Sequence, residues 1–336
     1  MTILLFLIVL GSLVFVHELG HFVVAKIFGI RVDEFGLGFP PKIVSFKKGE
    51  TVYSLNIIPF GGFVKIYGED PEEKGERSFV SKNRWIQAGV LVAGVLCNML
   101  FAWLLISVSF MMGQPTPASY GPVENPQVTV LSVEEGYPAK EAGIKEGDVI
   151  LAESSESLIE SISGEEEVEI TYIRGEEEFT KTIETQDGII GISVDDIGIL
   201  KLPFFSAFIE GFKTTYSLTK LITVELGKFF GRAFTGSANF SEVTGPVGII
   251  SLVGEASRLG LVHLITFTAL ISIHLAIINL VPFPALDGGR LLFVAIEGIT
   301  RKTIPIKFFQ YANLIGFAIL MILMVVVTYN DILGFM

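Results

Sequence analysis

Residues 3–28 read ILLFLIVLGSLVFVHELGHFVVAKIF, an apolar run in which the only ionisable side chains are His17, Glu18, His21 and Lys26. A helix of about 20 apolar residues crosses the hydrocarbon core of a bilayer. The run has neither the basic start nor the small-residue cleavage site of a signal peptide. We therefore expect it to stay in the protein as a membrane-spanning helix that carries ionisable groups.

Three further apolar runs cover roughly residues 86–112, 261–281 and 309–328. Of the 336 residues, 50% are hydrophobic, and the mean hydropathy is +0.60, which is too high for a soluble protein of this size. Residues 204–234 mix apolar and charged side chains, which favours amphipathic helices on the outer membrane surface over a fifth span. The sequence thus predicts a polytopic α-helical membrane protein with four spans.

Charge is unevenly distributed over the loops between these runs. Basic residues gather between the first two runs, at residues 26–84, and again at 301–307. The long stretch Gln114–Lys201 has only five basic residues and many acidic ones. Cytoplasmic loops of membrane proteins carry the excess of Lys and Arg. We therefore place both basic loops in the cytoplasm, and the acidic stretch and both termini on the other side of the membrane.

Composition also excludes some partners and cross-links. The net charge is −12 and no basic stripe is present, so we expect no nucleic-acid partner. Cys97 is the only cysteine, so the chain has no internal disulfide framework. We expect this thiol to pack within its apolar run.

The first basic loop alternates apolar and polar residues. Ile43–Phe46 and Val52–Leu55 flank Lys47–Glu50, and Phe63–Ile66 continues the pattern after two glycines. We expect a cytoplasmic, membrane-associated β-hairpin within residues 29–85. It is either a small cap or an edge strand that pairs with an extended substrate, and the sequence leaves both roles open.

The acidic stretch contains strand-like runs and resembles a bacterial PDZ domain. The runs are Val128–Val133, Val149–Ala152, Val168–Ile173 and Glu178–Ile183. Between the first two, Pro138–Ile150 resembles the PDZ signature of a short helix, a glycine turn and a Gly-Asp pair before a buried strand. We expect a small extracytoplasmic α+β domain, PDZ-like, with its core at about residues 126–186.

The peptide groove of this PDZ-like domain is expected to be incomplete. The segment after Leu151 is short, so the helix at about Leu158–Ser163 that would flank a bound peptide is stunted. The domain either acts as a gate against substrates whose outer portions have not been trimmed, or recruits a peptide ligand such as a partner's C-terminus. Gly36–Phe39 resembles the carboxylate loop of PDZ domains but lies far from this stretch, and we expect a turn there.

His17-Glu18-Leu19-Gly20-His21 is an H-E-x-x-H motif. On a helix, His17 and His21 are four residues apart and project from the same face, where they can hold one metal ion. Glu18 lies next to that face and can act as a general base. Ionisable groups inside a membrane are costly, so we expect these three residues to serve a function rather than a structural role.

Two histidines leave such a site incomplete, because a catalytic zinc ion usually has three protein ligands. Asp287 is the best candidate for the third, since it follows the third apolar run within a segment rich in proline and glycine, residues 282–289. Irregular backbone at membrane depth is tolerated only where it lines a cavity. Asp287 also suits the N-cap of the following helix, and the residue taken alone does not separate the two roles.

Several motifs, taken in order, resemble the site-2 protease family of intramembrane metalloproteases. They are His17–His21, Ser78-Phe79 with Lys82 and Trp85, Ala93-Gly94 with Asn98, Gly245–Ile249, and Asn279–Arg290. Together with a PDZ insertion between the second and third spans, they cover nearly the whole chain.

The resemblance implies zinc as the cofactor, bound by His17, His21 and Asp287, with Glu18 as the general base. It also implies that the enzyme hydrolyses peptide bonds within or near the transmembrane segments of single-span membrane proteins, such as anti-sigma factors or remnant signal peptides. The implied location is the cytoplasmic (inner) membrane of a bacterium, with the lipid bilayer as a partner.

Asn98 and Asn279 match asparagines of the family motifs, and we expect both to contact substrate. The proline expected before Asn98 is Val95 here, and His274 stands where the family has asparagine. His274 either supports the metal ligands or forms a hydrogen bond within the helix bundle, and we expect the latter.

The predicted chain has four parts. Residues 1–112 hold the first two spans and the hairpin region, 113–203 the PDZ-like domain, 204–260 amphipathic helices and the Gly-Pro-Val-Gly-Ile loop, and 261–336 the last two spans. The alternative is a membrane scaffold or transport protein with a vestigial metal site. A metal transporter is expected to space its ligands along a path, whereas the ligands here are expected to converge on one point, so we favour the protease.

Overall fold

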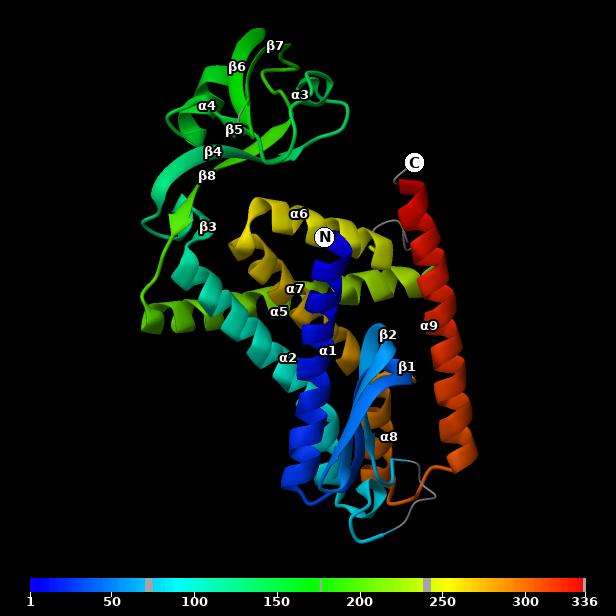
Figure 1. The fold of residues 1–336 in the computed structure, drawn as a ribbon. Helices are drawn as coiled ribbons and strands as arrows, with labels where there is room; N and C mark the ends of the chain where they lie inside the picture. The colour runs from blue at the N-terminus through cyan, green and yellow to red at the C-terminus, as the bar shows by residue number, and fades with distance from the viewer. Residues whose placement is uncertain (70–74, 176, 238–242, 335–336) are drawn as a thin grey trace. The chain divides into compact units, whose positions relative to one another are not determined.

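The computed structural model describes residues 1–69, 75–175, 177–237 and 243–334 (Figure 1). The chain divides into two compact units, one formed by Met1–Ser109 with Phe208–Met336 and the other by Phe110–Ala207. The first unit holds the long apolar helices, and the second holds most of the acidic stretch. Lys74, one of the basic residues of the first loop, lies outside the described residues.

Four helices of the described residues are long and apolar enough to cross a membrane. They are α1 (Thr2–Ile27), α2 (Arg84–Met112), α7 (Leu261–Leu280) and α9 (Ile306–Gly334). Large apolar side chains are exposed on them, including Leu100 and Ile322. Such a surface is unfavourable in water and suits contact with lipid. The prediction of a polytopic helical membrane protein is confirmed.

The predicted hairpin is present as β1 (Val32–Lys48) and β2 (Thr51–Ile66), which pair in an antiparallel manner. Both strands are long and irregular in register. Residues 34–37 of β1 pair with residues 52–55 of β2 on one side and with residues 62–65 on the other. The two strands therefore fold back on themselves into a small sheet that is wider than a simple hairpin.

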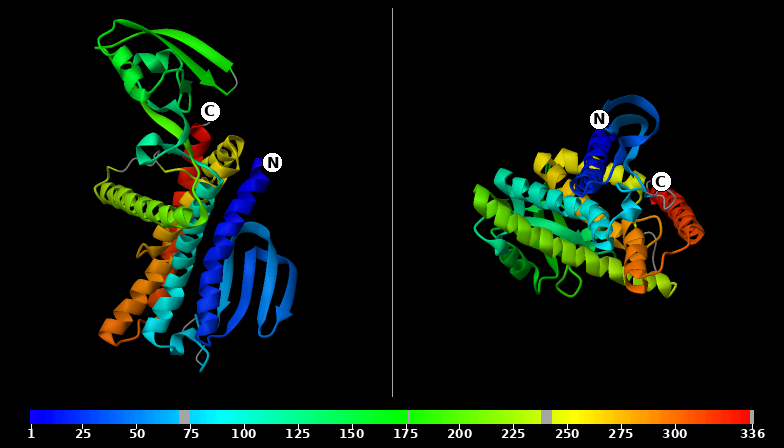
Figure 2. Two further views of the ribbon diagram at one scale, coloured as in Figure 1. Left: turned by 90° about the vertical axis from the view of Figure 1, so that its left-hand side faces the viewer. Right: turned by 90° about the horizontal axis from the view of Figure 1, so that it is seen from below.

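The expectation of a turn at Gly36–Phe39 is wrong, because these residues continue β1. Gly36 lies opposite Phe63, and a Cβ atom on it would be 2.6 Å from the Phe63 ring. The glycine therefore gives room to a cross-strand side chain rather than to a turn. The sheet lies along α1 in both side views (Figures 1 and 2), and there Phe35 packs edge-on against Phe22 at 5.5 Å.

Shorter or more polar helices complete this unit. They are α5 (Phe204–Phe234), α6 (Pro246–Leu259), α8 (Asp287–Thr300) and the 3₁₀ turn η1 (Phe79–Ser81). α5 is one continuous amphipathic helix of 31 residues and is not among the helices apolar enough to span a membrane. It crosses α2, where Trp103 Nε1 donates to the Phe208 carbonyl at 2.8 Å and Gly211 lies against Ser107.

The Gly-Pro-Val-Gly element begins α6, and a residue of α9 caps it. The N–H groups of Gly245 and Gly248 donate to the two carboxylate oxygens of Asp331, at 3.0 and 2.8 Å. First-turn N–H groups have no partner within their own helix, so Asp331 satisfies two of them. A Cβ atom on Gly245 would lie 2.7 Å from Asp331 Oδ2, so the glycine allows α6 and α9 to approach this closely.

The second unit is built on an antiparallel sheet with the strand order β3-β8-β4-β5-β6-β7. The strands are β3 (Gln114–Pro117), β4 (Glu124–Val133), β5 (Val149–Ile150), β6 (Glu167–Arg174), β7 (Glu177–Glu184) and β8 (Ile192–Leu200), with η2 (Ala118–Tyr120), α3 (Pro138–Glu141) and α4 (Ser155–Ile162) between them. The four predicted strands are among them. The sequence does not predict β8, because Asp195 and Asp196 interrupt its apolar pattern.

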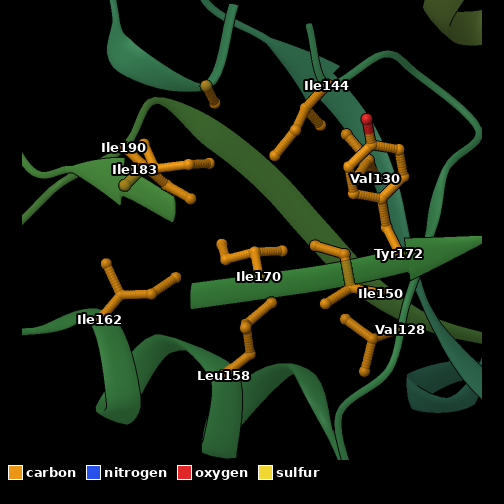
Figure 3. Packing of buried hydrophobic residues seen from close by; sticks show 11 residues of the cluster. Val128, Val130, Ile144, Ile150, Leu158, Ile162, Ile170, Tyr172, Ile183 and Ile190 are labelled. Atoms are coloured by element: carbon orange, nitrogen blue, oxygen red, sulfur yellow. The ribbon is translucent and has the colours of Figure 1, made fainter. Parts of the chain in front are cut away.

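One hydrophobic core holds the second unit together. Leu158 and Ile162 of α4 point toward Ile170 of β6 (Figure 3), and all three are buried. Asp148, from the Gly-Asp pair, is also buried, and the Arg174 guanidinium contacts both of its oxygens at 2.7 Å. The Gly-Asp pair therefore serves a bidentate ion pair that ties the segment before β5 to β6.

Candidate metal centre

His17 and His21 lie on the face of α1 that packs on α2, and both are buried. Gly20 shares this face, and a Cβ atom on it would be 2.4 Å from the carbonyl oxygen of Ala93. Small residues allow close approach of helix backbones in membranes. The missing side chain of Gly20 thus brings α1 near enough for both imidazoles to reach α2.

The facing surface of α2 consists of Val90, Gly94 and Asn98, which lie four residues apart and therefore on one face. The carbonyl of Val90 accepts a hydrogen bond from His21 Nδ1 at 2.8 Å, and the amide of Asn98 lies 3.3 Å from His17 Nδ1. Between them, a Cβ atom on Gly94 would lie 2.5 Å from His21 Nε2 and 2.7 Å from His17 Cε1. One face of α2 therefore orients both imidazole rings.

Asp287 is the first residue of α8 and reaches the same point. The N-cap residue of α8 is Leu286, whose side chain makes no cap hydrogen bond. Asp287 Oδ2 instead lies 3.0 Å from His17 Nε2 and 3.2 Å from His21 Nε2. The structure thus brings Asp287 together with the two histidines, and it does not use Asp287 as a helix cap.

The loop before Asp287 is held by α9. Ala285 has a φ of +75°, a strained conformation for a residue with a side chain, and its N–H donates to Asn313 Oδ1 at 3.1 Å. Gly316, three residues further along α9, lies against Pro284, whose carbonyl oxygen would be 2.4 Å from a Cβ atom on the glycine. The fourth apolar helix therefore fixes the backbone that presents Asp287.

His17 Nε2, His21 Nε2 and Asp287 Oδ2 form a triangle with sides of 3.0, 3.2 and 3.2 Å. Bonds of about 2.0–2.1 Å to a tetrahedral zinc ion place its ligand atoms about 3.3–3.4 Å apart. Two imidazoles and one carboxylate are also the donor set of many catalytic zinc sites, which keep a fourth position for water or substrate. The residues present therefore fit a zinc ion in both spacing and chemistry.

The protonation of the site matches this donor set. A carboxylate at Asp287 and neutral imidazoles at His17 and His21 are the forms that bind a metal ion. His21 Nδ1 donates to the Val90 carbonyl, which leaves Nε2 of the neutral ring as the unprotonated nitrogen facing the triangle.

Glu18 is half-buried and lies next to a strand of the small sheet. A Cβ atom on Gly62 of β2 would be 2.8 Å from Val14 Cγ1 and 3.5 Å from Glu18 Cγ. Among the described residues, residues 62–65 pair only with β1, so their other edge has no strand partner. A strand segment with one unpaired edge therefore lies beside the predicted general base.

The remaining candidates from the sequence lie in different environments. Asn98 is fully buried against His17, whereas Asn279 is half-buried on the last turn of α7 and makes no side-chain hydrogen bond within the described part of the chain. His274 Nδ1 donates to the carbonyl of Leu270 at 2.9 Å, a bond within α7. His274 thus hydrogen-bonds within the bundle, as we expected.

Some residues that shape the centre escaped the sequence patterns. Val90 acts through its backbone carbonyl, which no side-chain pattern reveals. Asn313 and Gly316 lie on one face of α9. A polar residue and a small residue three positions apart in an apolar helix indicate a contact face, and this was the signal in the sequence.

Four apolar helices that hold a His-His-Asp cluster beside a glutamate are the features of a membrane metallopeptidase. Residues 5–323 match peptidase family M50. The chain therefore belongs to peptidase family M50, the family of the site-2 proteases.

Relatives from three bacteria align over nearly the full length of the chain. The chain is 37% identical over 345 residues to the protein CPE1693 of Clostridium perfringens, with 99% of each chain covered. It is 30% identical over 426 residues to the zinc metalloprotease RasP of Geobacillus kaustophilus, covering 99% of this chain and 98% of the relative. It is 30% identical over 427 residues to the regulator of sigma-W protease RasP of Bacillus subtilis, covering 98% of each chain.

Membership of this family establishes the class of activity. The protein is a zinc metalloprotease of the membrane, and its substrates are proteins. Zinc is its cofactor, as predicted, and His17, His21 and Asp287 form the candidate metal site. Because the alignments with the two RasP proteins are longer than the 336 residues of this chain, those relatives contain additional residues.

Proposed function

We propose that the protein is an intramembrane endopeptidase in which His17, His21 and Asp287 hold the zinc ion and Glu18 is the general base. The observation that carries this proposal is the convergence of three donor atoms, from α1 and α8, within 3.2 Å of one another. The bond that is cut lies within or near the transmembrane segment of a single-span membrane protein.

The chemistry follows from the groups around the triangle. Zinc held there supplies a Lewis acid that polarises the scissile carbonyl and makes water more acidic. Glu18 takes a proton from the attacking water and passes it to the leaving amine. The Val90 carbonyl holds the His21 ring, and Gly94 leaves room for both imidazoles, so the geometry is set before substrate arrives.

A transmembrane substrate must unwind before it is cut, because a helical peptide bond keeps its carbonyl in the backbone hydrogen-bond ladder. The unpaired edge of residues 62–65, beside Glu18, supports the role of β2 as a strand that pairs with the unwound segment. Such pairing replaces the hydrogen bonds that the substrate helix loses. Substitutions in β2 that preserve the sheet should lower cleavage, and unchanged cleavage would contradict this role.

The name of one relative supports the class of substrate that we propose. The Bacillus subtilis relative is named a regulator of sigma-W protease. We infer that the substrates of this chain are single-span membrane proteins, such as anti-sigma factors or remnant signal peptides.

We propose the orientation from the charge of the loops, and the four parts from the order of the apolar runs and motifs. The basic loops at residues 26–84 and 301–307 support a cytoplasmic position for both, with the two termini outside a bacterial cytoplasmic membrane. On this arrangement residues 1–112, 113–203, 204–260 and 261–336 remain the functional parts. The sheet beside α1 is then cytoplasmic, and α5 lies along the outer membrane surface.

We also propose that residues 113–203 form an extracytoplasmic PDZ-like domain that acts as a gate. The eight-residue α4 is short, and Ser155 at its start hydrogen-bonds Asp196 of β8 through both its N–H and its hydroxyl at 2.9 Å. A short helix tied to the neighbouring strand is poorly suited to open for a peptide. A gate would bar substrates whose outer portions are still intact.

The proposal is tested by cleavage of a model single-span substrate with purified protein in detergent. Wild type is compared with Glu18→Gln, which keeps the size of the side chain but cannot act as a base. We expect the wild type to cleave, to lose activity on zinc chelation and to regain it with added zinc. Glu18→Gln should bind zinc equally and lose at least about a hundredfold in rate, because general base catalysis contributes that much.

Two results would overturn the proposal. Equal cleavage by wild type and Glu18→Gln would mean that another residue is the base. Cleavage that survives complete removal of zinc would exclude the role of the triangle.

A further inference from the structure

Asn98 has an unmatched atom beside the metal centre. The residue has no exposed surface, and its Nδ2 lies 3.3 Å from His17 Nδ1. Its Oδ1 is buried and has no hydrogen-bond partner among the described residues. A buried amide oxygen without a partner is destabilising, so this arrangement needs an explanation.

The protonation of His17 provides one. If Nε2 of His17 faces the metal, Nε2 carries no proton, and the proton of the neutral ring sits on Nδ1. Nδ1 must then donate, and Asn98 is its only hydrogen-bond partner in the described part of the chain. A donor requires an acceptor, and Nδ2 of an amide is not one.

A half-turn of the Asn98 amide supplies the acceptor that His17 Nδ1 requires. Oxygen and nitrogen of an amide have nearly the same shape, and their assignment follows from the hydrogen bonds around them. After the turn, Oδ1 accepts from His17 Nδ1, which gives the unmatched oxygen a partner. His17 then has the same arrangement as His21, whose Nδ1 donates to the Val90 carbonyl at 2.8 Å.

We propose that Asn98 is a positioning residue whose Oδ1 accepts the Nδ1 proton of His17 and thereby fixes the tautomer that presents Nε2 to zinc. The inference rests on the proposed function of His17 as a ligand. It differs from the contact with substrate that the sequence suggested, because a side chain without exposed surface is placed to hold another residue. The hydroxyl of Ser272, on α7, donates to the backbone carbonyl of Asn98 at 2.9 Å and does not contact the side-chain amide.

The test measures zinc affinity of the purified full-length protein in detergent, by competition with a coloured chelator. Asn98→Leu keeps the shape but removes the acceptor, whereas Asn98→Asp keeps an acceptor. Ser272→Ala is the matched control, because it removes a buried hydrogen bond of the same residue without touching His17. The absorption spectrum of the cobalt(II)-substituted proteins reports the ligand set independently of affinity.

We expect Asn98→Leu to bind zinc about 10–100-fold more weakly, the usual cost of losing a partner behind a metal-ligating histidine. Its cobalt spectrum should differ from that of the wild type. Asn98→Asp and Ser272→Ala should stay within about threefold of the wild type, because neither removes the acceptor. If Asn98→Leu fails to fold, Asn98→Ala also lacks the acceptor and should show the same weakening.

Wild-type affinity and an unchanged cobalt spectrum in Asn98→Leu, or in Asn98→Ala, would overturn the inference. Equal weakening in Asn98→Leu and Asn98→Asp would also overturn it, because the effect would then come from packing. The variant His17→Ala separates this failure from failure of the proposed function. If His17→Ala binds zinc as tightly as the wild type, the metal lies elsewhere and the proposed function itself is wrong.

Discussion

Two glycines set how closely α1 and α2 approach around the metal centre. Gly20 faces the backbone of Ala93, and Gly94 faces the rings of His17 and His21. On the same face of α2, Val90 and Asn98 each contact an imidazole. Catalytic geometry must be held to a fraction of an ångström, so residues without side chains matter as much here as the ligands.

Gly94→Ala tests this directly. The added methyl group would lie 2.5 Å from His21 Nε2, so at least one imidazole must move. We expect zinc affinity to fall on the order of tenfold or more, and cleavage to fall with it, because ligand orientation is lost. Gly89→Ala on the same helix is the control, since a Cβ atom there meets nothing within 4 Å. Equal zinc affinity in the two variants would show that the ring positions do not depend on Gly94.

At this scale the sequence predicted the ionisable residues and missed their supports. His17, Glu18 and His21 follow from one motif, and Asp287 follows from a second motif together with the family resemblance. The roles of Val90 and Gly94 could not be predicted, because they arise from a backbone carbonyl and from an absent side chain. Such roles depend on which faces of two helices meet, and that is decided by packing.

At the scale of elements, α6 is joined to α9 by one carboxylate. Asp331→Ala should lower the free energy of unfolding by about 1 kcal/mol, the typical cost of losing a helix cap. Thermal unfolding in detergent measures this, and Glu255→Ala is the control, because Glu255 is an exposed acidic residue of α6. Equal melting temperatures for the two variants would show that the cap at Gly245 and Gly248 contributes nothing.

The stability of the fold depends on pH through Glu50, in the turn between β1 and β2. Hydrogen bonds from Arg77 and Lys26 lower the pKa of Glu50 from 4.5 to about 2. A lowered pKa in the folded state stabilises the fold above pH 4.5, and this contribution is lost as the pH falls from 4.5 to about 2. The melting temperature of the wild type should therefore fall more steeply over this range than that of Glu50→Gln. Parallel curves for the two proteins would contradict this account.

The elements of the sheet regions were predicted unevenly, for physical reasons. The hairpin around Gly49 follows from alternating residues and a turn. The second pairing of residues 34–37 does not, because Gly36 and Gly38 are also typical of turns and nothing local indicates Phe63 as a partner. Pairing between distant segments depends on the whole sheet, whereas alternation is a local property.

At the scale of the whole molecule, the chain consists of a unit rich in apolar helices and a unit built on one sheet. Composition predicted this division, because apolar runs and acidic stretches are separate in the sequence. Which side of the membrane each loop occupies rests on charge alone. The PDZ-like identity of residues 113–203 rests on the signature around Asp148 and stays a prediction.

Removal of the second unit separates a gate from a recruiting domain. Pro117 of β3 pairs directly with Ile197 of β8, so residues 118–196 can be replaced by an Asn-Gly turn that keeps the two strands paired. A gate predicts that this variant cleaves untrimmed substrates several-fold faster than the wild type, while trimmed substrates are cleaved equally. Slower cleavage of both substrates would instead indicate recruitment and would contradict the gate.

The proposed mechanism depends on His17, His21 and Asp287 holding the catalytic zinc ion. Anomalous diffraction at the zinc edge, from crystals of the wild-type protein, tests it most directly. We expect one zinc ion bound by His17 Nε2, His21 Nε2 and an oxygen of Asp287, at about 2.0–2.2 Å from each. A zinc peak elsewhere in a protein that still cleaves its substrate, with none at this triangle, would contradict it.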